Sequence, residues 1–348
     1  MSTRSAWQAC LVSALAFLLG GCARPSPFGR KAQQAAPEIL TPELLAEEAA
    51  RDAKFAGPPN ARDATGEFTR LFHAAEDPLN EQRVAVLRQH RVLLVHGLLG
   101  EVGMGVRGFL DRVKHDQRLL DYQKDQEEVL SRHQILYDRV VFRSHAVQRS
   151  GEKIAEAILA SDRPVILFSH SKGCVDTLEA LLQLGRKGEL QRVRGWIAVQ
   201  GPFAGSPLAE RYVSHGGLRT VGIVSMRALG GDFDAIRDLT PEARAKYLQE
   251  HSTEIERLTQ SLPILCFASW EQPGTAAPQA QADAGKEVQQ PLTSAFRIQP
   301  ESQILAGSAY VAKAGVSHSA TVIRAGQAYD RPAFTRALLA MLADRTGK

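Results

Sequence analysis

One segment constrains the fold more than any other: residues 164–176, with the sequence PVILFSHSKGCVD. Residues 165–168 form a continuous apolar run, as expected for a parallel strand that is buried on both faces. Ser169 and Gly173 are small and flank Ser171, where a tight strand-to-helix turn leaves little room for side chains. Such a turn exposes the Ser171 hydroxyl at the C-terminal edge of the sheet. The segment therefore predicts Ser171 as a nucleophile.

The pattern around Ser171 is Ser-x-Ser-x-Gly, so Ser169 adds a Cβ where Gly-x-Ser-x-Gly would have none. The first amides of the following helix, starting with the backbone N–H of Lys172, would point at a developing oxyanion. The alternative interpretation is a serine-rich turn in which Ser171 only caps a helix. Because an unactivated serine is a poor nucleophile, the catalytic interpretation requires a histidine and an acid elsewhere.

The chain has 348 residues and 44% hydrophobic composition, enough for one large core or two modest ones. The formal net charge is only +4, and no basic run is interleaved with aromatic residues. These features argue against a nucleic-acid partner.

The N-terminus has Arg4, an apolar stretch over residues 10–19, and then Gly-Gly followed by Cys22. This order predicts a signal peptide over residues 1–22 rather than a membrane span. The ending resembles a bacterial lipobox, which implies that Cys22 is the lipidated first residue of the mature protein. With Arg24 and no Asp behind the cysteine, the resemblance implies an envelope lipoprotein of the outer membrane, facing the periplasm or the exterior. The alternative is an ordinary secretory signal.

Residues 23–67 are rich in Pro, Ala and charge and are predicted to be a flexible tether, followed by a globular domain over residues 68–347. If Cys22 is acylated and the signal is removed, only Cys174 and Cys266 remain. They are expected to be buried thiols, with a bridge between them left open.

The apolar runs alternate with helix-compatible segments, which is the βαβ rhythm of a doubly wound, mostly parallel sheet. The predicted strands are residues 91–95, 139–142, 165–168, 196–199, 262–268 and 304–311. Residues 208–260 interrupt the rhythm and are expected to be a helical cap or lid, or else packing helices without a gating role. Residues 272–290 are rich in Gln, Ala and Pro and predict a low-complexity surface insertion.

The predicted strand 91–95 runs into His96-Gly97-Leu98-Leu99-Gly100, which resembles the His-Gly-x-x-Gly turn of bacterial lipases and esterases. The resemblance implies that the backbone N–H of Leu98 joins that of Lys172 as an oxyanion donor. It gives His96 a scaffolding role, and Gly97 and Gly173 a supporting one. Asp176 is expected to be a structural partner, and the Lys172 side chain to be incidental.

Two further segments complete the resemblance to bacterial lipases and esterases of the α/β-hydrolase superfamily. Residues 200–207 (QGPFAGSP) resemble the Gly-x-Pro-x-x-Gly-Ser-Pro block of lipases and polyester hydrolases. His318 falls in a loop after the last predicted strand, in the order nucleophile, acid, histidine that this fold uses. His318 is therefore the predicted catalytic base.

The acid is less defined, because an ungapped comparison places no carboxylate where these lipases have their Asp-Gly-x-Val-Pro segment. Glu271 is the first acid after the predicted strand 262–268, and it is the preferred partner of His318. The next candidates for the acid are Glu287, Asp283 and Glu301.

The combined expectation is a serine ester hydrolase that acts on acyl or lipid esters without a metal or cofactor. Its pocket is expected to include Leu98, Leu99, Met104 and Phe203. One alternative is a polyhydroxyalkanoate-type depolymerase, thioesterase or amidase with the same Ser171 and His318. Another is a non-catalytic lipid-binding lipoprotein with a degraded triad.

Overall fold

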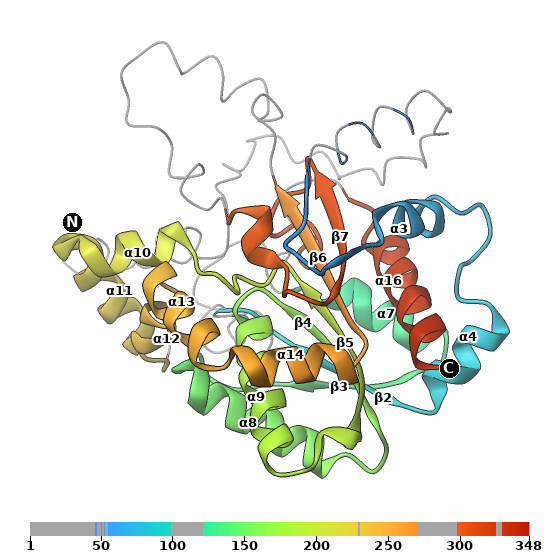
Figure 1. The fold of residues 1–348 in the computed structure, drawn as a ribbon, viewed down its shortest axis with the longest axis horizontal. Helices are drawn as coiled ribbons and strands as arrows, with labels where there is room; N and C mark the ends of the chain where they lie inside the picture. Colours follow the sequence, from blue (N-terminus) through green and yellow to red (C-terminus); the bar gives the residue numbers. More distant parts are fainter. Residues whose placement is uncertain are drawn as a thin grey trace, which may run out of the picture.

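The structure is a computed structural model, and it describes residues 46, 50, 52, 55–98, 100, 121–228, 230–270, 298–324 and 329–347. Within these residues, seven strands form one parallel sheet in the order β1-β7-β6-β5-β4-β2-β3 (Figure 1). The strands are β1 (Arg62–Asp63), β2 (Arg91–Val95), β3 (Leu136–Val140), β4 (Val165–His170), β5 (Val193–Val199), β6 (Ile264–Trp270) and β7 (Ala309–Ala314).

Helices cover both faces of the sheet. One face carries α3 (Thr65–Phe72), α4 (Glu81–Arg88), α7 (Lys124–Arg132) and α16 (Arg331–Thr346). The other carries α8 (Val147–Ala160), α9 (Lys172–Arg186), α10 (Pro207–Ser214), α12 (Asp234–Arg237) and α14 (Ser252–Ser261). The remaining helices are α11 (Gly216–Ala228), α13 (Pro241–Glu250) and two 3₁₀ turns, η2 (Leu190–Arg192) and η5 (Pro300–Gln303). The predicted doubly wound parallel architecture is confirmed.

The central strand β4 shows why the sequence folds in this way. All six of its residues are buried. Val165 and Leu167 belong to the core beneath α8 and α9, whereas Ile166 and Phe168 belong to the core beneath α16. A strand with both faces covered must be apolar at successive positions, and this is the pattern of residues 165–168.

Two predicted strands were placed wrongly. The strand expected at 139–142 is β3, Leu136–Val140, which lies at the sheet edge, pairs only with β2 and alternates in burial. Val141, in the apolar run that suggested the strand, is 58% exposed. The strand expected at 304–311 is β7, Ala309–Ala314. Ile304 and Leu305 are buried without being in a strand, because a turn that includes Gly307 (φ +81°) follows them. Apolar burial alone does not distinguish a strand from a packed turn.

The folded domain begins earlier than the predicted boundary at residue 68. β1 pairs with β7, and Ala64 N–H donates to the Tyr310 carbonyl. Asp52 is buried, forms an ion pair with Lys313 and accepts a hydrogen bond from the Ala314 amide (2.9 Å). Part of the predicted tether 23–67 is therefore packed on the sheet. Asp52, one of the charged residues of that segment, is paired with the buried Lys313.

Helices α10 to α14 occupy the predicted insertion at 208–260, and α10 and α12 lie over the C-terminal edge of the sheet. α13 begins at Pro241, and the Thr240 hydroxyl caps it by accepting from Ala243 N–H (3.3 Å). Movement of these helices as a lid stays a prediction.

Cys174 and Cys266 are free, buried thiols, so the question of a bridge between them is answered in this structure. None of the helices in the described ranges has the length and apolar character needed to span a membrane. The predicted signal peptide 1–22, with Cys22, and the insertion 272–290 lie outside the described residues.

Candidate active site

Ser171 lies at the corner between β4 and α9, at the carboxyl edge of the sheet. Its backbone has φ +55° and ψ −130°, a region that a non-glycine residue occupies only under strain. The corner is held on both sides, because Ser171 N–H donates to the Val199 carbonyl (2.9 Å) and the Ser171 carbonyl accepts from Cys174 N–H (2.9 Å). The Ser171 side chain makes no capping bond to the helix, so the alternative of a simple cap is not supported.

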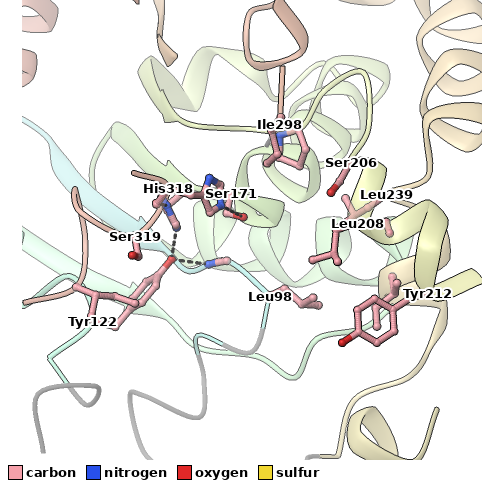
Figure 2. Close-up of a pocket in the computed structure, with 16 residues that line it drawn as sticks. Leu98, Tyr122, Ser171, Ser206, Leu208, Tyr212, Leu239, Ile298, His318 and Ser319 are labelled. Carbon is pink, nitrogen blue, oxygen red and sulfur yellow. Dashed lines mark hydrogen bonds between the residues drawn. The ribbon is translucent and has the colours of Figure 1, made fainter. Parts of the chain in front are cut away.

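His318 lies in the loop after β7, and its side chain contacts Ser171. Its Nε2 is 2.8 Å from the Ser171 hydroxyl oxygen, across 147 positions of sequence (Figure 2). Burial, with a smaller contribution from the nearby His170, lowers the pKa of His318 to about 3. The imidazole is therefore neutral near pH 7 and can accept the serine proton.

The loop that carries His318 is fixed by side chains at the ends of two strands. The Ser269 hydroxyl of β6 donates to the Val316 carbonyl (2.9 Å), and the Gln200 amide donates to the Ser317 carbonyl (3.1 Å). Gln200 also accepts from the Thr321 hydroxyl (3.0 Å). Gln200 is 1% exposed and has φ +54°, so it is a second strained residue at this edge.

The glycines of the two predicted motifs are required by close packing. A Cβ on Gly173 would come within 2.3 Å of the His96 carbonyl oxygen, and a Cβ on Gly97 would be 3.0 Å from that of Ser171. The ring nitrogens of His96 lie 2.7 Å from the Gly97 carbonyl and 3.0 Å from the Phe142 carbonyl. His96 thus braces the turn between β2 and the pocket and makes no bond to Ser171.

The Lys172 side chain is not incidental, contrary to expectation. It is 1% exposed and its Nζ lies 2.6 Å from a carboxylate oxygen of Asp176, which is equally buried. Burial raises the pKa of Asp176 to about 7, despite the adjacent lysine. Arg244 of α13 is also buried, and its Nε donates to the Phe203 carbonyl (3.0 Å). These groups form an ionic layer beneath the corner that holds Ser171.

A pocket opens above Ser171 and His318 (Figure 2). Leu208 and Tyr212 of α10 and Leu239 after α12 lie together on one side of Ser171, and Tyr122 and Ser319 lie on the other. Leu98 lines it as predicted, and Gly97 lines it as well. Phe203 does not line it: the ring is buried edge-on against Trp196, with centroids 5.8 Å apart. The predicted lining residues Leu99 and Met104 lie outside the described residues.

None of the four predicted acids is placed beside His318 by the described part of the structure. Glu271, Asp283 and Glu287 lie outside the described residues, and Glu301 is exposed on η5. Among the described residues, no carboxylate is hydrogen-bonded to His318. In the same part of the chain, no cluster of His, Cys, Asp or Glu side chains is placed to hold a metal ion.

The hydrogen-bonding roles of several polar residues around the site were missed from the sequence: Tyr122, Ser169, His170, Gln200 and Ser269. Ser169, which replaces the first glycine of the motif, accepts a hydrogen bond from the Trp196 indole (2.7 Å) and contacts the Cys174 sulfur (3.3 Å). The sequence signal was present, since polar residues that end buried strands are unusual unless they are satisfied by partners. Their partners, however, lie far away along the chain.

Comparisons with known proteins agree with the fold. Residues 147–261, about a third of the chain, match the family model of lecithin:cholesterol acyltransferase. No curated protein matches the chain. The crystal structure of the metagenomic carboxyl esterase MGS0156 is 19% identical and covers 89% of this chain and 97% of its own, with a TM-score of 0.59.

Two further solved structures resemble the chain more loosely. The mature Bacillus licheniformis lipase BlEst2 is 16% identical, covering 73% of this chain and 89% of its own with a TM-score of 0.43. A soluble variant of the Saccharomyces cerevisiae monoglyceride lipase, bound to a substrate analogue, is 15% identical, covering 74% and 87% with a TM-score of 0.37.

Proposed function

We propose that this chain, an α/β-hydrolase by its fold, cleaves carboxylic esters with Ser171 as nucleophile and His318 as general base. The observation that carries the proposal is the 2.8 Å contact between the Ser171 hydroxyl and His318 Nε2 at a strained strand-to-helix corner. A serine oriented in this way, beside a neutral imidazole and inside a pocket, is the arrangement that acyl transfer requires. The match to a carboxyl esterase fold supports the same reaction class.

In the proposed cycle, the Ser171 oxygen attacks the ester carbonyl while its proton passes to His318 Nε2. The negative charge that develops on the carbonyl oxygen is stabilised by the backbone N–H groups of Leu98 and Lys172, which we assign as oxyanion donors. His318 then gives its proton to the leaving alcohol, and an acyl-enzyme remains. Water attacks this ester with the same proton transfers in reverse, which releases the acid and restores Ser171.

The pocket favours an acyl or lipid ester as substrate. No Asp, Glu, Lys or Arg is among the described residues that line it, and Leu208, Ile236, Leu239 and Ile298 provide an apolar surface beside Ser171. An uncharged aliphatic acyl chain is stabilised there by burial, at about 0.8 kcal/mol per methylene. Cys22 as a lipid anchor and an outer-membrane location fit such a substrate, and both are part of the proposal.

We assign Glu271 as the acid that orients His318. The residue before it, Trp270, ends β6, and its carbonyl accepts a hydrogen bond from Gly315 N–H (2.7 Å), three positions before His318. A carboxylate beside the imidazole would raise the pKa of His318 above the value that burial alone gives. Glu271→Gln should therefore lower kcat about 10²-fold or more. In the pH profile of kcat/KM, the fall in activity on the acid side should move to lower pH. An acid side at the same pH as in wild type would exclude Glu271 as the partner.

The lecithin:cholesterol acyltransferase match supports a second fate for the acyl-enzyme, which is transfer to an alcohol in place of water. The same Ser171 and His318 would serve, with His318 deprotonating the acceptor hydroxyl. Incubation of the enzyme with an ester and a long-chain alcohol distinguishes the two fates. A new ester product indicates transfer, and free acid alone indicates hydrolysis.

The proposal is tested by hydrolysis of a chain-length series of p-nitrophenyl acyl esters. Wild type should hydrolyse the series, and Ser171→Ala should lose the activity at every chain length. Ser214→Ala is a matched control, because Ser214 lies on the exposed side of α10, and its hydroxyl contacts the Glu210 carbonyl (2.8 Å) and Nδ1 of the exposed neighbour His215 (3.0 Å), away from the pocket. Folded wild type that cleaves no ester would favour the non-catalytic lipid-binding alternative.

A further inference from the structure

The mechanism above gives no role to His170, the buried histidine of the pocket. His170 is the residue immediately before Ser171, is 4% exposed and lines the same pocket. Its ring lies 4.9 Å from that of His318, centroid to centroid. Neither ring nitrogen of His170 contacts Ser171; both are used by other partners.

The Nε2 of His170 faces two oxygen atoms that can only accept hydrogen bonds. The His318 carbonyl is 2.9 Å away and the side-chain oxygen of Gln200 is 3.3 Å away. Nε2 must therefore carry the proton, because two acceptors cannot be bonded by an unprotonated nitrogen. His170 thus donates to the backbone of the very residue that acts as general base.

The Nδ1 of His170 lies 2.7 Å from the Tyr122 hydroxyl oxygen. This hydroxyl also accepts the backbone N–H of Gly97 (2.8 Å), in the turn that presents the Leu98 amide (Figure 2). Burial lowers the pKa of His170 to about 4, so the ring is neutral near pH 7. With its proton on Nε2, Nδ1 is an acceptor and the Tyr122 hydroxyl donates to it.

These contacts join the two halves of the site. A continuous buried chain runs from the Gly97 amide through Tyr122 and His170 to the His318 carbonyl. The His318 loop has three consecutive backbone carbonyls that accept side-chain hydrogen bonds. The carbonyls of Val316, Ser317 and His318 accept from Ser269, Gln200 and His170, respectively. Of these three anchors, His170 is the one whose described contacts also reach the oxyanion turn.

We propose that His170 is a positioning residue that couples the His318 loop to the oxyanion turn through Tyr122. It sets the placement of the His318 imidazole relative to Ser171 and, at the same time, the placement of the Leu98 amide. The inference rests on the proposed reaction at Ser171. A misplacement of about 1 Å in such a site lowers the rate about 10²-fold, so loss of either contact should appear in kcat.

Two substitutions separate the two bonds of His170. Asn places its amide near the position of Nδ1, so His170→Asn keeps an oxygen for the Tyr122 hydroxyl and loses the donor to the His318 carbonyl. Gln places its amide near Nε2, so His170→Gln keeps that donor and loses the bond to Tyr122. Tyr122→Phe removes only the hydroxyl oxygen and tests the chain from its other end.

The experiment measures kcat and KM for p-nitrophenyl esters, with each rate divided by the active sites titrated with a phosphonate ester. His170→Asn should lower kcat about 10²-fold, and Tyr122→Phe about tenfold, each with KM within about threefold of wild type. His170→Gln should recover most of the kcat that His170→Asn loses. A purely structural role would lower the number of titrated sites and leave kcat per site unchanged.

His90 supplies the matched control. It is also buried, its pKa is also lowered by burial, and its Nδ1 bonds a backbone carbonyl, that of Val86 (2.8 Å). It lies just before β2, at the opposite end of that strand from the site. His90→Asn should leave kcat per site within about twofold of wild type.

A second readout does not depend on activity. Imidazole ¹⁵N shifts should show His170 in wild type as a neutral ring protonated at Nε2, identified by the signal that disappears in His170→Gln. If wild type hydrolyses no ester but shows this tautomer, the proposed function fails and the hydrogen-bonded chain stands. Protonation of His170 at Nδ1, or equal kcat per site in wild type, His170→Asn and Tyr122→Phe, would overturn the inference.

Discussion

The two sides of the pocket are stabilised by different interactions, hydrogen bonds on one side and apolar packing on the other. On the polar side, His170, Gln200 and Ser269 each donate to one carbonyl of the His318 loop, over distances of 2.9–3.1 Å. On the apolar side, the side chains of Leu208 and Ala209 in α10 and of Leu239 after α12 line the pocket without directional bonds. Hydrogen bonds weaken steeply when their geometry changes, whereas apolar contacts depend mainly on area and volume. The polar side should therefore determine the rate, and the apolar side the choice of substrate.

The largest effect is expected from the polar side. His318→Ala removes the general base and should lower kcat/KM by about 10⁴-fold or more. A matched control is His145, whose Nδ1 is 2.8 Å from an Asp232 carboxylate oxygen but which does not contact Ser171. His145→Ala should retain activity within about threefold. If instead His145→Ala abolishes turnover and His318→Ala does not, the assignment of the base is wrong.

A smaller effect is expected from the ionic layer beneath the polar side. Lys172→Met leaves Asp176 buried without its partner at 2.6 Å, and breaking such a pair costs about 3–5 kcal/mol of unfolding free energy. Urea unfolding of the variant measures this loss directly. Lys153→Met, in an exposed pair with Glu156, is the control and should leave the midpoint unchanged. A Lys172→Met variant as stable as wild type would show that the buried pair contributes nothing to the corner.

The smallest effect on overall rate, and the largest on selectivity, is expected from the apolar side. Ala209→Leu fills space in the pocket, so kcat/KM for long acyl chains should fall about tenfold while that for acetate changes little. Glu210→Leu adds the same side chain to the exposed side of α10 and serves as the control. A p-nitrophenyl ester series compares the variants. An equal fall at every chain length would show that the two sides of the pocket do not act separately.

The sequence predicted those parts of the site that a short motif marks. Ser171 and Gly173 belong to one strand-to-helix segment, and the resemblance to lipases and esterases gave the roles of His96 and His318. The contacts of Gly173 with His96, and of His96 with Phe142, nevertheless join distant parts of the chain. Strands that are buried on both faces, such as β4 and β2, can also be predicted from their continuous apolar runs. β3 does not, because an edge strand needs only alternate burial.

The polar side could not be predicted, because its contacts join residues that are far apart in the chain. His170 reaches Tyr122 across 48 positions and His318 across 148. No local pattern specifies which buried polar side chain will satisfy which carbonyl. The Lys172 side chain was wrongly expected to be incidental, even though its i,i+4 spacing from Asp176 was a local signal for their ion pair.

The most direct test is covalent labelling of the folded protein with a fluorophosphonate, followed by intact-mass measurement and peptide mapping. Phosphonylation requires a serine that is activated by a base and placed beside oxyanion donors. A single adduct on the peptide that contains Ser171 is the predicted result. It should be absent when the protein is denatured before labelling, and it should form about 10³-fold or more slowly in His318→Ala. Labelling elsewhere, or at Ser171 with equal rates in wild type and His318→Ala, would contradict the assignment of Ser171 and His318 as the catalytic pair.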